Sequence, residues 1–349
     1  MSVAVVGGET PAAEASAPRS RGRKSYGRYV GGKFLGSLGS LVFMLVVNFF
    51  LFRVLPGDPA RVLGRGRLST PEQVAEYNKT HGLDQPLVQQ FFTFLKNTFT
   101  GDLGISIKYN IPVSQMILDR MWPTLLLVGT STLLSTLIGI WMGINQAWKR
   151  NSFFDRSTTG GALVLYSMPE WWLGLVLIAV LAVGPGPLPS LFPTGGLHST
   201  DAGSGAIAQG LDMAWHLALP VFTLTLAYLA EYSLIMRASV LDEVGEDYLT
   251  TARAKGLRDI QVRNRHAVRN ALLPATTVVA LNLGFVVSGA ITIEKVFSIP
   301  GLGLLANDAL EGPDFWVLQG TFLVASGAVI FANLAANLLY GLLDPRVRT

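Results

Sequence analysis

The stretch Phe34–Leu55 reads FLGSLGSLVFMLVVNFFLFRVL and carries one charged side chain, Arg53. An α-helix rises about 1.5 Å per residue, so about 20 apolar residues cross the ~30 Å hydrocarbon core of a bilayer. The apolar core of a cleaved secretory leader is shorter, about 7 to 15 residues. This stretch therefore predicts a helix that stays in the membrane and spans it.

Five more apolar stretches of similar length follow along the chain. Half of all residues are hydrophobic and 14% are charged, whereas about a quarter of the residues of soluble domains are charged. The six predicted spans cover about 34–55, 124–147, 160–183, 216–236, 275–297 and 316–341. The sequence thus predicts an all-α membrane protein with six transmembrane helices.

Basic side chains indicate how these spans are oriented, because short loops rich in Lys and Arg stay in the cytoplasm. Loops 148–159 and 237–274 and the C-terminal end are basic, whereas loops 184–215 and 298–315 contain no Lys or Arg. The basic residues of the first three segments are Lys149, Arg150, Arg156, Arg237, Arg253, Lys255, Arg258, Arg263, Arg265, Arg269, Arg346 and Arg348. We therefore expect both termini in the cytoplasm.

Two segments are expected to lie outside the helical bundle. Residues 1–32 have too few apolar side chains to fold alone, which predicts a disordered basic cytoplasmic tail before a permease domain of residues 33–349. Residues 56–123 form a loop long enough to cross the membrane regardless of its charge, and we expect an external helical insert there. Within it, Thr70-Pro71-Glu72-Gln73 predicts the start of one short helix, and a second helix is expected between Asp84 and Gly101.

The second predicted span contains Ser135, Gly139 and Gly143, one small residue at every fourth position. Residues four apart lie on the same face of a helix. Small side chains on one face let the backbones of two membrane helices approach closely. This pattern predicts a tight contact between the second span and a neighbouring helix.

The basic loop 237–274 is too polar to span a membrane, yet it carries the end signals of ordered helices. Gly245-Glu246-Asp247-Tyr248 places acidic side chains at a helix start, and Lys255-Gly256 places a cation and a glycine at its end. We expect a two-turn helix that ends with Gly256 in the left-handed conformation. Asp259 is predicted to cap a second helix, and Pro274 to mark the turn from the membrane surface into the fifth span.

This loop resembles that of a known family. The run from Asp247 to Pro274 is similar to the coupling-loop signature of binding-protein-dependent ABC permeases, in the variant used by dipeptide and oligopeptide permeases; Thr250 stands where the general signature has glutamate. Further matching motifs occur in order along nearly the whole chain from about residue 33: Leu55-Pro56-Gly57-Asp58-Pro59, Gly82-Leu83-Asp84-Gln85-Pro86, Gly101-Asp102-Leu103-Gly104, Ser167-Met168-Pro169-Glu170-Trp171-Trp172-Leu173-Gly174 and Val296-Phe297-Ser298-Ile299-Pro300-Gly301-Leu302-Gly303. The chain resembles the first permease subunit of such importers, with the type I ABC importer permease fold.

The resemblance implies peptide import across the cytoplasmic (inner) membrane, with no covalent chemistry by this chain. The short helix would seat in a groove of a separate ATPase, whose closure would switch the spans between inward and outward access. The implied coupling residues are Asp247, Tyr248, Thr251, Ala252, Arg253, Ala254, Lys255, Gly256 and Leu257. The implied partners are a second homologous permease, two ATP-binding subunits or domains that hold ATP and Mg, and an external substrate-binding protein. No nucleic acid and no cofactor on this chain are expected.

The residue inventory agrees with a subunit that depends on a partner for ATP. No Gly-x-x-x-x-Gly-Lys-Ser/Thr loop occurs to cradle phosphates. The chain has no cysteine, and its four histidines are scattered. We therefore predict no thiolate site and no metal site.

Two further places are candidate sites. Glu231 lies inside the fourth predicted span, where a carboxylate is a functional candidate by default; it either faces the translocation pathway or pairs structurally. Pro300, Gly301 and Gly303 predict a tight turn after the fifth span, as an outer gate or a docking surface for the substrate-binding protein. The neighbouring pair Glu294-Lys295 is expected on the outer side.

Two other classes of protein remain open at this level. A secondary transporter or channel would be expected to carry broken helices or paired intramembrane charges, and only Glu231 stands out. An intramembrane hydrolase needs a base, but no span has a histidine in its middle and no Gly-x-Ser-x-Gly elbow occurs. The cargo also stays open between dipeptides, longer peptides, nickel chelates and other solutes.

Overall fold

The computed structural model describes residues 26–54, 70–80, 82, 84–184, 190–201, 203, 205–286, 289–312 and 314–343. Most of the predicted tail, the start of the predicted insert and the C-terminal residues 344–349 lie outside these ranges. Within them the chain is helical, and its only β pairing is an isolated bridge between Ile105 and Pro112.

The helices follow one another as α1 (Tyr26–Phe49), α3 (Pro71–Thr80), α4 (Leu87–Thr100), α5 (Val113–Trp148), α6 (Phe153–Ser167), α7 (Glu170–Leu177), α8 (Ala206–Val244), α9 (Asp247–Ala254), α10 (Asp259–Gln261), α11 (Val268–Phe285), α12 (Ile291–Val296), α13 (Leu302–Glu311) and α14 (Phe315–Leu343). Three π-helical segments continue α1, α7 and α10: η1 (Phe50–Val54), η2 (Ile178–Val183) and η3 (Val262–Ala267). The first helix begins at Tyr26, inside the segment predicted to be a disordered tail.

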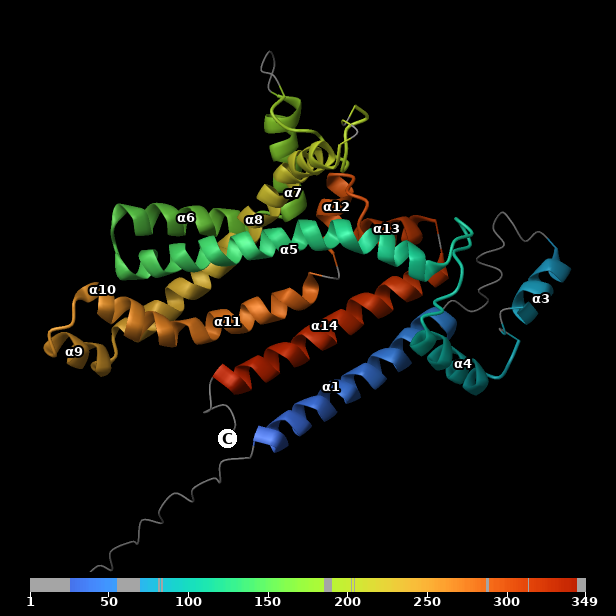
Figure 1. The fold of residues 1–349 in the computed structure, drawn as a ribbon, viewed down its shortest axis with the longest axis horizontal. Coiled ribbons are helices and arrows are strands. Elements are labelled where there is room, and N and C mark those ends of the chain that lie inside the picture. The colour runs from blue at the N-terminus through green and yellow to red at the C-terminus, as the bar shows by residue number, and fades with distance from the viewer. Residues whose placement is uncertain are drawn as a thin grey trace, which may run out of the picture.

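Four of the described helices are long and apolar enough to cross a membrane, and a bent pair makes a fifth candidate. The four are α1 with η1, α5, α8 and α14, which contain the first, second, fourth and sixth predicted spans. Figure 1 shows α1 and α14 side by side, with α5 and α8 crossing beside them. Short helices α3 and α4 lie at one end of the long axis, and α9 and α10 lie at the other end (Figure 1).

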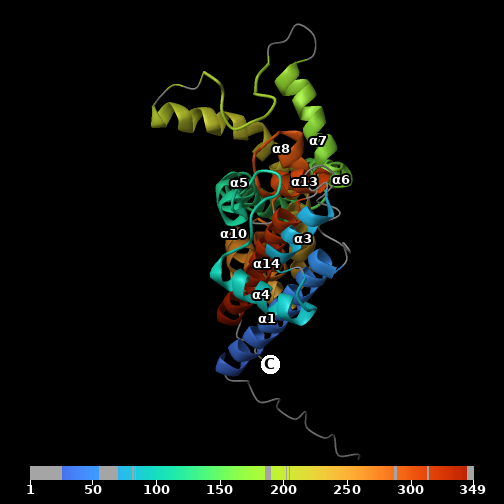
Figure 2. The same ribbon diagram turned by 90° about the vertical axis from the view of Figure 1, so that its right-hand side faces the viewer.

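The third predicted span, 160–183, is not one straight helix. Its residues belong to α6 and to α7 with η2, whose axes differ by 104°. The break falls at Met168, which is extended at φ −88° and ψ 132° and precedes Pro169. A proline ring disfavours the helical conformation of the residue before it, and it has no N–H for the helix. Helix α7 consequently projects away from the bundle (Figure 1 and Figure 2).

The fifth predicted span, 275–297, is also divided. Helix α11 ends at Phe285, and α12 begins at Ile291 after Gly289, which has a left-handed φ of +79°. Glycine has no Cβ and adopts this conformation readily. The predicted span is therefore divided between α11 and α12, and neither helix is among the described helices that are long and apolar enough to cross a membrane alone.

The closest helix pair in the core is α5 with α8, as the small-residue pattern predicted. A Cβ added to Gly139 would lie 2.7 Å from Cβ of Tyr232, and one added to Gly143 would lie 2.6 Å from the carbonyl oxygen of Ser233. No side chain fits at these distances. Ser135, on the same face, is fully buried.

Candidate functional site

The predicted two-turn helix is α9, and its ends are formed as expected. Asp247 lies in its first turn and Arg253 in its last turn, where each side chain complements the helix dipole. Gly256 follows with φ +79°, and its N–H donates to the carbonyl of Arg253 at 2.9 Å. The prediction of a left-handed glycine at this end is confirmed.

One face of α9 packs inward and the other is exposed. Leu249 and Ala252 are buried in a cluster with Val262 and Ala267 of η3, against which Trp148 of α5 packs. Ala252 is therefore part of the support of the helix and offers no outer surface. Most of the other predicted coupling residues are exposed: Asp247, Thr251, Arg253, Ala254, Lys255, Gly256 and Leu257, together with Thr250.

Tyr248, the remaining predicted coupling residue, joins three helices. Its hydroxyl donates to the Glu243 carboxylate at the end of α8 and accepts a hydrogen bond from Asn270 Nδ2 of α11 at 3.1 Å. Burial, with this bond to Glu243, raises the pKa of the Tyr248 phenol. Tyr248 thus holds α9 in place, and neither of its partners was predicted from the sequence, because both lie on other elements.

Two details of the loop differ from the predictions. Arg258, not Asp259, is the N-cap residue of α10, and its backbone N–H donates a hydrogen bond to Gln261 Oε1 at 3.1 Å. The Asp259 carboxylate instead accepts a hydrogen bond from the indole Nε1 of Trp148 at 2.7 Å. Pro274 lies inside the continuous helix α11, and the chain turns into α11 through the π-helical η3.

An ion pair between the buried Asp155 and the partly exposed Arg237 joins α6 and α8 near the same end of the molecule. Arg237 Nε donates to Asp155 Oδ1 at 2.8 Å, and its Nη2 donates to Oδ2 at 3.2 Å. Asp155 also accepts a hydrogen bond from the N–H of Asn151 at 2.9 Å. The bidentate geometry fixes the first turn of α6 against α8.

The predicted outer turn is built around Glu294. This carboxylate is fully buried, and it accepts hydrogen bonds from the Thr124 hydroxyl at 2.8 Å and from the Leu304 N–H at 2.9 Å. Gly301 and Gly303 pack against it and are buried too, so in this conformation they offer no surface to a receptor. Glu294 itself is therefore not available for contact with a substrate-binding protein in this conformation, and its place on the outer side of the membrane stays a prediction.

Lys295, the neighbour of Glu294, does lie on the surface. Its Nζ pairs with Glu311 Oε1 of α13 at 2.5 Å, and both side chains are more than half exposed. This lysine lowers the pKa of the Glu311 carboxyl. Exposed pairs of this kind contribute roughly 0 to 1 kcal/mol to stability.

Glu231, the predicted pathway candidate, is half-buried on α8 and makes no ion pair with any described residue. The hydroxyl of the next residue, Tyr232, accepts a hydrogen bond from Asn282 Nδ2 of α11 at 3.0 Å. A polar contact between spans therefore lies beside Glu231. Whether the carboxylate faces the pathway stays a prediction.

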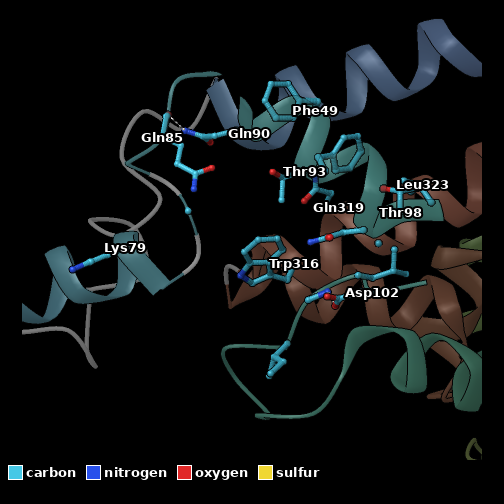
Figure 3. A pocket seen from close by; sticks show the side chains of 17 residues that line it. Phe49, Lys79, Gln85, Gln90, Thr93, Thr98, Asp102, Trp316, Gln319 and Leu323 are labelled. Carbon is cyan, nitrogen blue, oxygen red and sulfur yellow. Dashed lines mark hydrogen bonds between the residues drawn. The ribbon is translucent and has the colours of Figure 1, made fainter. Parts of the chain in front are cut away.

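A cavity of about 430 Å³ lies at the opposite end from α9, between α4 and α14. Figure 3 shows amide side chains, among them Gln90 and Gln319, together with the rings of Phe49 and Trp316 along its walls. None of the predicted site residues lines it. No group of three metal-ligating side chains occurs among the described residues.

Several long apolar helices, with a polar-faced helix held on a buried support at one end, define a multi-pass membrane protein of the permease class. The family described as "Binding-protein-dependent transport system inner membrane component" matches residues 135–349, and the corresponding N-terminal family matches residues 27–128. The chain belongs to this family of transport permease components.

Curated relatives cover nearly the whole chain. It is 37% identical over 316 residues to the dipeptide transport system permease protein DppB of Escherichia coli K12, covering 87% of this chain and 93% of the relative. It is 36% identical over 320 residues to the glutathione transport system permease protein GsiC of the same strain, covering 92% and 98%. A probable peptide ABC transporter permease protein, y4tP of Sinorhizobium fredii, is 32% identical over 324 residues, covering 92% and 99%.

A solved structure supports the fold. A chain of the MetNI methionine ABC transporter, in inward-facing conformations, superposes with a TM-score of 0.53 at 16% identity. The match covers 66% of this chain and 97% of that chain. The fold is therefore that of an ABC transporter permease.

Proposed function

We propose that this chain is one of two permease subunits of an ATP-driven importer of peptides in the cytoplasmic membrane. Its relatives are named for transport of dipeptides, glutathione and peptides, which supports di- or oligopeptides as the cargo class. In this proposal the second subunit is a homologous permease, and an external substrate-binding protein delivers the peptide. The chain itself binds no cofactor and hydrolyses nothing.

The proposed topology has six spans, made by α1, α5, α6 with α7, α8, α11 and α14. Both termini and the loop from α9 to η3 lie in the cytoplasm, because this loop carries the basic residues that short cytoplasmic loops retain. Residues 56–123, with α3 and α4, form the external insert at the opposite end of the molecule (Figure 1).

One observation carries the proposed link to ATP: α9 is exposed on one face and held rigidly on the other. A short helix exposed to water is not stable alone, and here Leu249 and Ala252 anchor it while Tyr248 connects it to α8 and α11. Its exposed residues are the surface that an ATP-binding subunit would contact: Asp247, Thr250, Thr251 and 253–257. Closure of two such subunits would move the spans as rigid bodies.

The proposal is tested by purifying the tagged chain from its native membrane in mild detergent. Mass spectrometry of the stoichiometric partners should identify an ATP-binding subunit and a second permease. Reconstituted with its partners, the complex should take up labelled dipeptide only when ATP and the substrate-binding protein are both supplied. A chain that purifies alone, or uptake that proceeds without ATP, would contradict the proposal and favour a secondary transporter.

A further inference from the structure

The strongest feature outside the α9 site is the fully buried carboxylate of Glu294. It lies on α12, one of two short helices between α11 and α14, and no Lys or Arg of the described residues pairs with it. A buried anion is costly unless its charge is compensated by hydrogen bonds. The groups that compensate this one must therefore stay in place while the protein works.

The donors come from two separate parts of the chain. Thr124 of α5 donates its hydroxyl proton to Oε1, and the N–H of Leu304, in the first turn of α13, donates to Oε2. The Thr124 hydroxyl oxygen in turn accepts the N–H of Leu302 at 2.8 Å. A helix N-terminus favours a negative charge, so α13 and Glu294 stabilise each other. Glu294 and Thr124 together join α5, α12 and the outer loop Ser298–Gly303.

Glycines close the space around this carboxylate. A Cβ on Gly301 would overlap Glu294 Oε2 and lie 2.5 Å from Thr124 Oγ1, and a Cβ on Gly289 would lie 2.8 Å from Glu294 Oε1. A Cβ on Gly303 would lie 2.8 Å from the Cα of Ile291. The backbone therefore surrounds the carboxylate without room for an added methyl group at any of these three glycines.

The outer loop has a further attachment at Phe297. The carbonyl of Phe297 accepts the N–H of Gly196 at 2.9 Å, which connects the loop to the segment between η2 and α8. The side chain of Phe297 packs against Gly174 of α7. Buried apolar side chains also pack α5 against this region, in one cluster that joins Leu127 to Phe297 and another that joins Ile117 to Leu302. Glu294 with Thr124 adds a buried polar contact between α5 and α12.

We propose that Glu294 is the positioning residue through which a displacement of α5 reaches the outer loop Ser298–Gly303. Because separation of Thr124 from Glu294 would leave a buried charge short of a donor, α5, α12 and the start of α13 move as one body. The inference rests on the proposed transport function. It adds to that function one specific contact, Thr124 with Glu294, through which movement driven by the cytoplasmic ATPase would reach the outer end of the pathway.

The test uses the assembled complex and the natural absence of cysteine in this chain. Ser298, an exposed loop residue, is replaced by cysteine in the parent, and its reaction with a membrane-impermeant maleimide is measured without nucleotide and with ATP trapped on the partner subunits. In the parent the two labelling rates should differ. In Glu294→Ala and Thr124→Val the difference should disappear and peptide uptake should fall at least about tenfold, while ATP is still trapped.

Three matched variants separate positioning from simple loss of folding. Thr124→Ser keeps the hydroxyl and should retain uptake and the labelling difference, whereas Thr124→Val removes only the donor and acceptor. Glu311→Gln removes an exposed carboxylate of α13 and should behave as the parent. If Glu294→Ala does not assemble, the comparison of Thr124→Val with Thr124→Ser tests the proposal. The proposal is overturned if the labelling rates with and without trapped ATP differ as much in Thr124→Val as in Thr124→Ser.

Failure of the proposed function is distinguishable from failure of this inference. A parent complex that takes up no peptide would count against the function. The Ser298→Cys reporter does not depend on uptake. If the labelling difference between the two nucleotide states is as large in Glu294→Ala as in the parent, the inference about Glu294 is overturned; loss of that difference in the variant supports it.

Discussion

The indole Nε1 of Trp148 donates a hydrogen bond to the Asp259 carboxylate at 2.7 Å, which joins the last residue of α5 to the first residue of α10. Arg253 of α9 lies over the same indole ring, 5.9 Å from its centroid. The end of α5 is therefore in direct contact with the helix proposed to meet the ATPase. No intermediate element separates the two.

Substitution of Trp148 by Phe should weaken this contact selectively. The ring still packs against the Leu249 cluster, but the donor to Asp259 is lost, at a cost of about 1 kcal/mol because the acceptor is exposed and can bind water. We expect uptake to fall several-fold while the ATPase activity of the complex persists. Hydrogen exchange over residues 247–261 should become faster; unchanged exchange would contradict the assigned role of the bond.

Gly256→Arg should leave the protein in the membrane but separate ATP hydrolysis from transport. A Cβ at Gly256 meets no other atom within 4 Å, so the change does not disturb the core of the chain. It costs about 1 to 2 kcal/mol of left-handed strain and places a long side chain on the free face of α9. The measurement is peptide uptake per ATP hydrolysed.

Gly256→Asn is the matched control, because Asn tolerates the left-handed conformation better than other residues that carry a side chain. It should retain most of the uptake. Normal ATP-driven uptake by Gly256→Arg would contradict the assignment of α9 as the coupling helix.

Gly143→Ala should destabilise the α5 and α8 pair, because the added methyl would lie 2.6 Å from the Ser233 carbonyl oxygen and 2.7 Å from Cβ of Met236. Backbone shifts of this kind typically cost about 1 to 3 kcal/mol. Gly160→Ala on α6 meets nothing within 4 Å and should be neutral or stabilising, since Ala favours a helix over Gly by about 1 kcal/mol. In detergent, Gly143→Ala should melt below the parent, and Gly160→Ala should melt at or above the parent temperature.

Arg237 and Asp155 should show a positive coupling in a double-mutant cycle. Arg237→Ala leaves a carboxylate buried without its cation, and Asp155→Asn removes the charge that the cation needs. We expect Arg237→Ala alone to cost about 2 kcal/mol or more, and the double variant Arg237→Ala with Asp155→Asn to lose less than the sum of the two. Strict additivity of the unfolding free energies would show that the pair does not stabilise the junction of α6 with α8.

The sequence predicted features whose signals are local. Both ends of α9 are specified within ten residues, by Asp247 at its start and by the glycine that must follow its last turn, and the structure has both. The face formed by Ser135, Gly139 and Gly143 predicted a close helix contact because periodicity alone places these residues together. The long apolar stretches likewise predicted α1, α5, α8 and α14.

Other features depend on partners that lie far along the chain. Burial of Glu294 requires Thr124, 170 positions away, and the position of Tyr248 requires Asn270 on another helix. The bend at Met168 was missed for a different reason: the apolar residues on both sides were joined into one span, although Ser167, Pro169 and Glu170 interrupt them. A proline inside an apolar stretch was the available signal.

Helix α5 has the unusual length of 36 residues and is uninterrupted from Val113 to Trp148. Thr124 and Trp148 stand about 36 Å apart along its axis, at about 1.5 Å per residue. A continuous helix compresses and stretches very little, so it acts mechanically as a strut. If the proposed ATPase contact is correct, a displacement of one ångström along the axis at Trp148 would reach Thr124 as nearly one ångström, neither enlarged nor absorbed on the way.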